Sequence, residues 1–191
     1  DNSGLIKSPA GGGAWNFISK QTASADATID FTSGIDSTYK EYVFTFKDIH
    51  GSSAHQLSFQ GNAAGGSGYN ETMTTTNFRC FQNEAGTDAE LNYVGGDEDQ
   101  AQGTAFQLIA QALDTDNDAC LGGFLHLFNP SSTTFVKHFQ SRLAVSKSGD
   151  GAAMSFVAGY FNTTSAIDEI QFKMASGNID AGDICLYGIS S

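Results

Sequence analysis

Two histidines are the residues whose type and spacing most directly suggest chemistry. His126 and His138 flank the segment Asn129–Thr134, whose Asn-Pro step forces the chain out of helix and whose Ser and Thr residues can bond locally to the backbone. A hairpin centred near Ser132 would place His126 opposite His138, with Cβ atoms about 5 Å apart. A zinc site needs further ligands, and no other His or Cys lies beside them at ligand spacing. We therefore interpret both residues as structural or interfacial.

An Asp-rich segment, Asp114–Asp118, is the second candidate, because oxygen-rich loops suit calcium. The helical calcium-loop pattern fails, since its sixth position is Ala119 instead of Gly and its twelfth is Leu125 instead of Glu. A non-helical calcium loop remains an alternative. Our preferred interpretation is an ordinary Asx-rich turn. The acidic cluster Gly96–Asp99 is interpreted as a turn as well.

The chain shows no catalytic signature. Gly65–Tyr69 contains a serine between glycines but lacks the spacing of a nucleophile elbow. The Gly-rich segment Gly61–Gly68 has no Lys-Ser/Thr ending, so a phosphate-binding loop is not expected. We predict a protein that is not an enzyme, with no catalytic residues, no cofactor-binding residues and no metal ligands, and therefore no cofactor.

The charge balance limits the partners. The 191 residues include 9 basic and 21 acidic side chains, which gives a formal net charge of −12. A non-specific nucleic-acid binder needs a basic surface that displaces counterions from phosphates, so no nucleic-acid partner is expected. The same charge repels anionic lipid headgroups, and no apolar run approaches the ~20 residues of a membrane helix, so no membrane partner is expected either. The chain begins at Asp1 and shows no signal-peptide pattern, although a missing leader stays open.

Three cysteines, Cys80, Cys120 and Cys185, are too few and too scattered for a disulfide framework. Cys120 and Cys185 lie in apolar strand contexts, where we expect them to act as small buried hydrophobes. A single disulfide between two of the three remains an alternative.

The pattern of apolar residues predicts an all-β fold. Residues 1–14 form an N-terminal arm with Pro9 and a run of glycines but no periodicity, and residues 15–191 form a single domain. Eight to ten short strands are expected, with turn signals between them, at 27–32, 42–47, 57–59, 74–82, 124–128, 135–145, 154–160, 170–174 and 184–189. Residues 104–113 fit a strand or a helix, and we favour a strand. The sequence thus predicts an antiparallel β-sandwich, jelly-roll-like, with a short irregular arm.

Large aromatic rings are expected to fill the core. The alternation of Ile170, Phe172 and Met174 with polar residues is typical of a half-buried strand, and in the last strand Ile184 and Leu186 share one face. The predicted core contains five phenylalanines, Phe31, Phe44, Phe46, Phe156 and Phe172.

Several segments resemble a family of small β-rich virion structural proteins from tailed bacteriophages. The segments that carry the resemblance are Gln21–Ser24, Ile29–Tyr39, Leu125–Pro130, Gly159–Asn162 and Ser176–Ile189, within residues 15–189. The resemblance implies a non-enzymatic structural protein on the virion surface, which decorates or cements the capsid exterior or forms a fibre head. It transfers no active-site residue.

The resemblance also implies partners, namely phage capsid or fibre proteins and further copies of this chain in a homotrimer. Leu5, Ile6 and Pro9 of the arm could dock against a neighbour, and the low content of charged residues leaves surfaces that can be buried without desolvating many ions.

A carbohydrate-binding β-sandwich module is the alternative from a different functional class, since one fold hosts many functions. Such a module would recognise a host-surface glycan through exposed aromatic residues, for which Trp15, Tyr69 and Tyr93 are the candidates. A hydrolase is the third and weakest interpretation, because no spacing fixes a catalytic geometry.

Overall fold

The computed structural model describes residues 14–96 and 98–190, which form thirteen β-strands and no helix. The predicted arm, residues 1–14, therefore lies outside the described residues except for Ala14. The strands are β1 (Trp15–Thr22), β2 (Ile29–Phe31), β3 (Glu41–Gly51), β4 (Leu57–Ala63), β5 (Met73–Asn83), β6 (Ala89–Tyr93), β7 (Ala101–Gly103), β8 (Gln107–Leu108), β9 (Leu121–Phe128), β10 (Lys137–Lys147), β11 (Gly151–Phe161), β12 (Ile167–Met174) and β13 (Ile179–Ile189).

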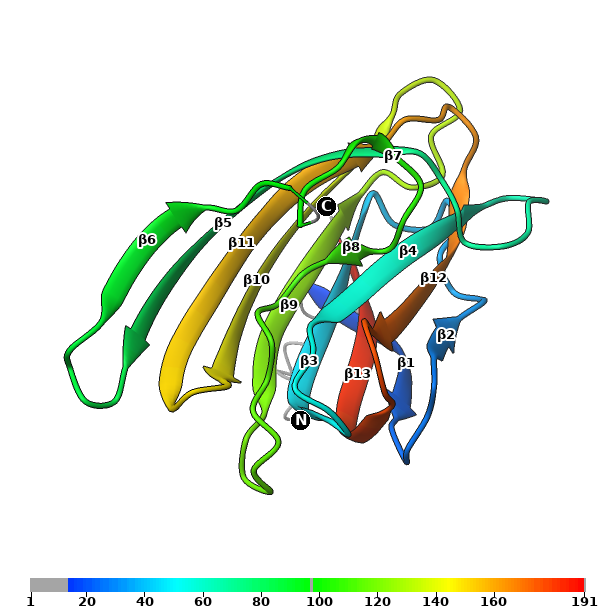
Figure 1. Ribbon diagram of the computed structural model, residues 1–191. Coiled ribbons are helices and arrows are strands. Elements are labelled where there is room, and N and C mark those ends of the chain that lie inside the picture. Colours follow the sequence, from blue (N-terminus) through cyan, green and yellow to red (C-terminus); the bar gives the residue numbers. More distant parts are fainter. Residues whose placement is uncertain (1–13, 97, 191) are drawn as a thin grey trace, which may run out of the picture.

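These strands build two antiparallel sheets of unequal size that pack against each other (Figure 1). The larger sheet has nine strands in the order β1-β13-β3-β9-β10-β11-β5-β6, with β7 paired to β5, and the smaller has the order β2-β12-β4-β8. The predicted all-β antiparallel sandwich is confirmed. The thirteen strands exceed the eight to ten expected, because β1, β6 and β7 are not among the predicted segments. β1 and β6 contain no fully buried residue, and β7 has only three residues, so none shows a clear alternation.

The core between the sheets is built from alternating residues of the strands, as the period of two demands. Along β10 every second side chain is buried, including Phe139, Leu143 and Val145. Phe31, Phe44, Phe46 and Phe172 are buried as predicted. The rings of Phe44 and Phe172 come from opposite sheets and meet edge to face with centroids 5.2 Å apart.

The prediction that Phe156 belongs to the core is wrong. The buried residues of β11 include Ala153, Ser155 and Val157, so Phe156 points to the opposite face of the sheet. There it stacks on Phe78 of β5, with centroids 4.7 Å apart and planes 6° from parallel. The misassignment has a physical cause: β11 carries apolar residues on both faces, so alternation alone cannot tell which face is buried.

The predicted register of the hairpin between β9 and β10 is also wrong. His126 pairs with Gln140 instead of His138, and His138 pairs with Tyr160 of β11. The register is displaced by two residues from the predicted one. An even displacement leaves both histidines on the same face of the sheet. The connecting loop contains a turn in which Ser132 N–H donates to Asn129 C=O, and Asn129 has a positive φ of 46°. Such irregular loops do not fix a register from sequence alone.

Residues 104–113, which fitted a strand or a helix, form neither a continuous strand nor a helix. Only Gln107–Leu108 is a strand, β8, at the edge of the smaller sheet beside β4. Ile109, Ala110 and Leu113 are buried, which accounts for the apolar pattern that fitted both alternatives.

The cysteines are all free: Cys80 is exposed, and Cys120 and Cys185 are half-buried. Cys120 and Cys185 are therefore less buried than expected. The alternative of a disulfide has no support among the described residues.

We expect Phe44→Ala to lower the free energy of unfolding by about 3–5 kcal/mol, because it opens a cavity where the two sheets meet. Urea denaturation of the full chain measures this. Phe17→Ala is the matched control, since Phe17 is 61% exposed at the edge of the larger sheet, and it should cost about 1 kcal/mol or less. Equal losses for the two variants would contradict the core assignment.

Candidate binding surface

The face of the nine-stranded sheet that points away from the smaller sheet carries an unusual number of aromatic side chains. We call it the outer face. Successive residues of a strand point to opposite faces of the sheet, so the residues that lie between the buried ones point to the outer face. The outer face presents Trp15, Phe17, Phe78, Phe124, Phe128, Phe156, Tyr160, Tyr187 and Tyr93. Trp15 is 47% exposed and Phe17 61% exposed, so these rings are open to solvent.

One group of these rings crosses from β1 to β9. Tyr187 of β13 contacts Trp15 and Phe17 of β1 edge to face, with centroids 5.5 Å and 5.7 Å apart. Trp15 also contacts the ring of His126, which in turn stacks on Phe128. We call these five residues the β1–β9 aromatic cluster. Edge-to-face packing of this kind holds the rings in fixed positions.

A trough lies beside this cluster, over strands β9, β10, β11 and β5. It consists of two hollows of about 330 Å³ and 440 Å³, which are joined because Thr76, Gln140 and Ala158 line both. Its middle is low over β10, β11 and β5, because Gln140 pairs with Ala158, which pairs with Thr76, and none of these three side chains has a ring. On β9 the same row ends at the ring of His126. The rows on either side are higher, as one contains Phe124, Phe156 and Phe78 and the other Phe128, His138 and Tyr160.

Polar groups in the trough come mainly from one strand. His138, Gln140 and Arg142 are successive outward residues of β10, and all three are exposed. The carbon Cζ of Arg142 lies 4.9 Å from the centre of the Phe124 ring, in the geometry of a cation–π contact. The arrangement is a polar line along β10 with aromatic rings on β9 and β11 at its sides.

The two arginines of the chain have opposite environments. Arg79 points into the sandwich, where its Nε donates to Glu90 at 3.2 Å and its Nη1 donates to Gln111 at 2.5 Å. Glu98 lies 4.0 Å from Nη1 as well. Among the described residues, the Arg142 side chain has no hydrogen-bond or ion-pair partner, so its guanidinium group is available to a ligand.

The histidines have separate environments. His126 Nδ1 lies in close contact with the Glu41 carboxylate, which comes from the neighbouring strand β3, and its ring is surrounded by aromatic rings. His126 is thus held between the Glu41 carboxylate and these rings. His138 lies at the trough and its ring contacts that of Tyr160, with centroids 5.7 Å apart.

The three aromatic residues proposed for sugar contact are not brought together. Trp15 and Tyr93 lie on the outer face at opposite ends of the nine-stranded sheet, and neither lines the trough. Tyr69 is half-buried in the loop after β4, where burial and the nearby carboxylates of Glu169 and Asp30 raise the pKa of its phenol. Sequence reasoning missed Arg142, Gln140 and the rings beside them, although the outward positions of 124–128 and 138–142 contain that signal.

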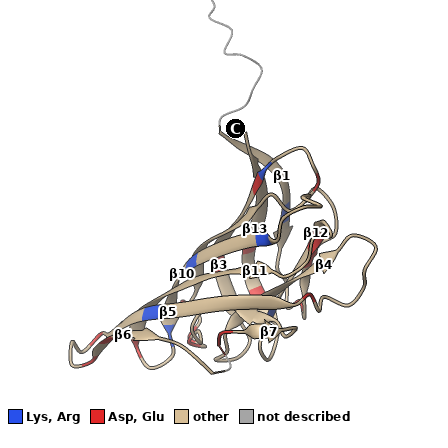
Figure 2. Ribbon diagram, turned by 90° about the horizontal axis from the view of Figure 1, so that it is seen from above, with Lys and Arg blue, Asp and Glu red and all other residues tan. Residues whose placement is uncertain are grey.

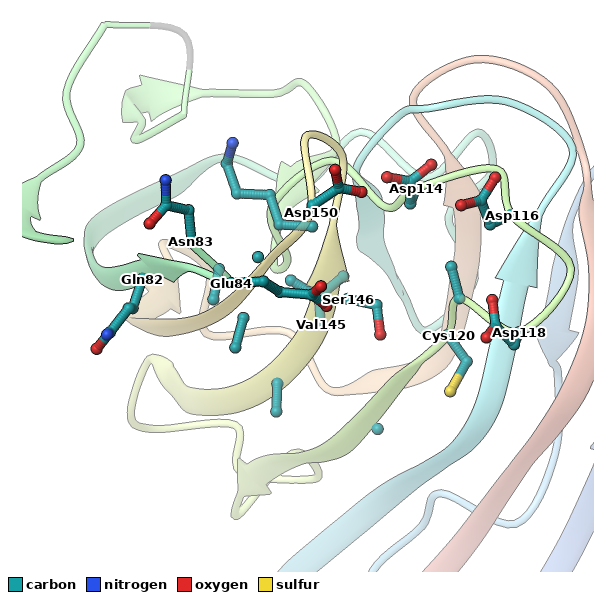
Figure 3. A pocket seen from close by; sticks show the side chains of 17 residues that line it. Gln82, Asn83, Glu84, Asp114, Asp116, Asp118, Cys120, Val145, Ser146 and Asp150 are labelled. Atoms are coloured by element: carbon teal, nitrogen blue, oxygen red, sulfur yellow. The ribbon is translucent and has the colours of Figure 1, made fainter. Parts of the chain in front are cut away.

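The Asp114–Asp118 loop lies at a different hollow of about 710 Å³, where Glu84 and Asp150 also contribute carboxylates (Figure 3). Figure 3 shows the side chains of Asp114, Asp116 and Asp118 spread along the loop. Within residues 14–96 and 98–190, no group of three or more His, Cys, Asp or Glu residues is placed to hold a metal ion. The calcium interpretation of this loop therefore gains no support.

Comparison with protein-family models, with known proteins and with solved structures finds no match to this chain. Among the residues that the structure describes, no helix is long and apolar enough to cross a membrane.

We expect Arg79→Gln and Arg142→Gln to differ in stability. Loss of Arg79 removes the cation beside Glu90 and Glu98 and the donor to Gln111, and it should lower the free energy of unfolding. Loss of Arg142 breaks no hydrogen bond within the described chain and should change stability by about 0.5 kcal/mol or less. Urea denaturation of the two variants provides the test, and a larger loss for Arg142→Gln would contradict this description of the outer face.

Proposed function

We propose that this protein is a non-enzymatic structural protein of a tailed bacteriophage, located on the virion surface. In this proposal it decorates or cements the capsid exterior or forms a fibre head. The resemblance of the segments named above supports the virion assignment, and the β-sandwich fold is compatible with it. One fold serves many functions, so the fold alone does not decide the role.

The observation that carries the proposal is the outer face with its exposed aromatic rings. Monomeric soluble proteins rarely expose large contiguous apolar surfaces, and such surfaces mark contacts with other molecules. The β1–β9 aromatic cluster lies at one edge of the nine-stranded sheet, where Trp15 and Phe17 remain open to solvent. Aromatic residues of this kind are enriched at protein–protein interfaces.

The proposed partners are phage capsid or fibre proteins and further copies of the same chain, arranged as a homotrimer. A stable interface removes more than about 1,000 Å² of surface in total. The aromatic cluster could supply the apolar centre of such an interface, and the low charge of the chain would limit the desolvation cost.

We expect purified particles to contain this protein in a copy number comparable with that of the major capsid protein if it decorates the capsid, and in a few copies if it forms a fibre head. Quantitative mass spectrometry of particles measures this ratio. Absence of the chain from purified particles would contradict the virion assignment.

We expect the isolated chain to scatter light as a species of three times its 20.1 kDa mass. A double replacement of Trp15 and Phe17 by Ser should shift this species toward the monomer, because it removes the exposed rings of the aromatic cluster. Phe135→Ser is the matched control, since Phe135 is 68% exposed but lies in the loop between β9 and β10. A monomeric wild-type chain would contradict self-assembly in solution.

A second candidate function, binding of a host-surface glycan, is favoured by the trough. Its two joined hollows lie in the size range of small-molecule sites and combine aromatic rings with a few polar groups. Sugar rings present an apolar face and polar edges, so rings such as Phe156 and Tyr160 beside an amide such as Gln140 suit them. The trough and the aromatic cluster meet at Phe128 of β9, which belongs to both, whereas the exposed rings of Trp15 and Phe17 lie on β1 and do not line the trough.

A further inference from the structure

We propose that the trough recognises an acidic polysaccharide, with Arg142 contacting the carboxylate of a uronic acid unit. This inference rests on the second candidate function, glycan binding, and names the class of glycan. Its first support is the state of Arg142 itself: an exposed guanidinium group that is oriented over Phe124 and has no acceptor among the described residues. The planar guanidinium fork matches a carboxylate in a bidentate arrangement.

The second support is the distribution of acidic residues. The chain has 21 Asp and Glu residues, and none of those within residues 14–96 and 98–190 lines either hollow of the trough. Figure 2 shows acidic positions both in the loops and on strands such as β12. Two carboxylates on neighbouring strands of the outer face are already engaged, Glu41 with His126 and Asp183 with Lys20 and Thr22. A trough with an unpaired guanidinium group and no described carboxylate is complementary to an anionic ligand. It is not complementary to a basic protein segment.

The third support is the shape of the polar line. Alternate residues of a strand are about 6.7 Å apart, so His138, Gln140 and Arg142 extend over about 13 Å along β10. Rings flank this line on both sides, from Phe128 and Tyr160 at one end to Phe124 and Phe156 at the other. An extended chain of sugar rings fits this geometry, because ring faces can pack on the aromatic side chains while hydroxyl and carboxylate groups reach the polar line.

The net charge of −12 acts against a polyanion at long range. Salt screens this repulsion, since the Debye length at physiological ionic strength is about 8 Å. Contacts within the trough are shorter than this length. The local charge of the trough therefore decides recognition at physiological salt, whereas at low salt the overall repulsion should weaken binding.

The test uses calorimetric titration of the full chain at physiological salt with three carboxylated probes: oligogalacturonate, alginate oligosaccharides and hyaluronate oligosaccharides. The matched neutral probe is the carboxyl-reduced form of each. We expect at least one carboxylated probe to bind, and its reduced form to bind about tenfold more weakly or worse. Arg142→Gln should lower affinity for the carboxylated probe by about the same factor and leave affinity for the reduced form unchanged.

Two further variants keep the test specific. Arg142→Lys retains the charge without the fork and should give an intermediate affinity. Lys47→Gln removes one positive charge from an exposed residue of β3 that does not line the trough, and it should change affinity less than twofold. Thermal unfolding of each variant tests whether the fold is retained, which we expect because no described residue forms a hydrogen bond or ion pair with the Arg142 side chain.

The outcomes separate this inference from the functions on which it rests. Equal binding of carboxylated and reduced probes, or normal binding by Arg142→Gln, would overturn the role of the carboxylate and leave glycan binding intact. Binding of a sulfated glycan such as carrageenan in place of all three carboxylated probes would overturn the uronic acid assignment. Failure of every carboxylated and reduced probe to bind would overturn the inference together with glycan binding, whereas the virion assignment is decided separately by the composition of particles.

Discussion

Phe172 connects the two sheets, and the rest of the structure depends on this packing. Its ring contacts Phe44 and Phe46 of the nine-stranded sheet and Phe31 and Phe59 of its own. The core therefore occupies the inner face of the larger sheet, and within residues 14–96 and 98–190 no further sheet covers the outer face. An exposed outer face follows directly from this one-sided packing, and its side chains are free to serve in recognition instead of stability.

The trough arises from side-chain volume along rows that run across the strands. Antiparallel pairing aligns one outward residue from each strand in a row across the sheet. The height of a row above the sheet therefore depends on the size of its side chains. The row with Gln140, Ala158 and Thr76 is low, and the rows of rings on both sides are high. Ala158 is thus as important for the trough as the rings, because a large side chain there would fill the space that Phe156 and Tyr160 enclose.

Sequence reasoning succeeded where one face of a strand is clearly polar. In β12 the alternation identified the buried residues Ile170, Phe172 and Met174, because their neighbours Gln171 and Lys173 are polar. It failed at Phe156, since apolar residues on both faces of β11 remove the contrast on which the pattern depends. The trough could not be predicted, because it combines residues from four strands whose pairing depends on loop geometry, as the two-residue displacement between β9 and β10 demonstrates.

The two arginines show how position on a strand separates stability from recognition. Arg79 occupies an inward position of β5, where burial would be costly without the carboxylates and amide that surround it. Arg142 occupies an outward position of β10, where water solvates the charge and no partner is needed to keep the chain folded. A guanidinium group that the fold does not require can bind and release a ligand without affecting the core. Because no described residue accepts a hydrogen bond from the Arg142 guanidinium group, a ligand carboxylate that binds there would displace no ion pair of the described chain.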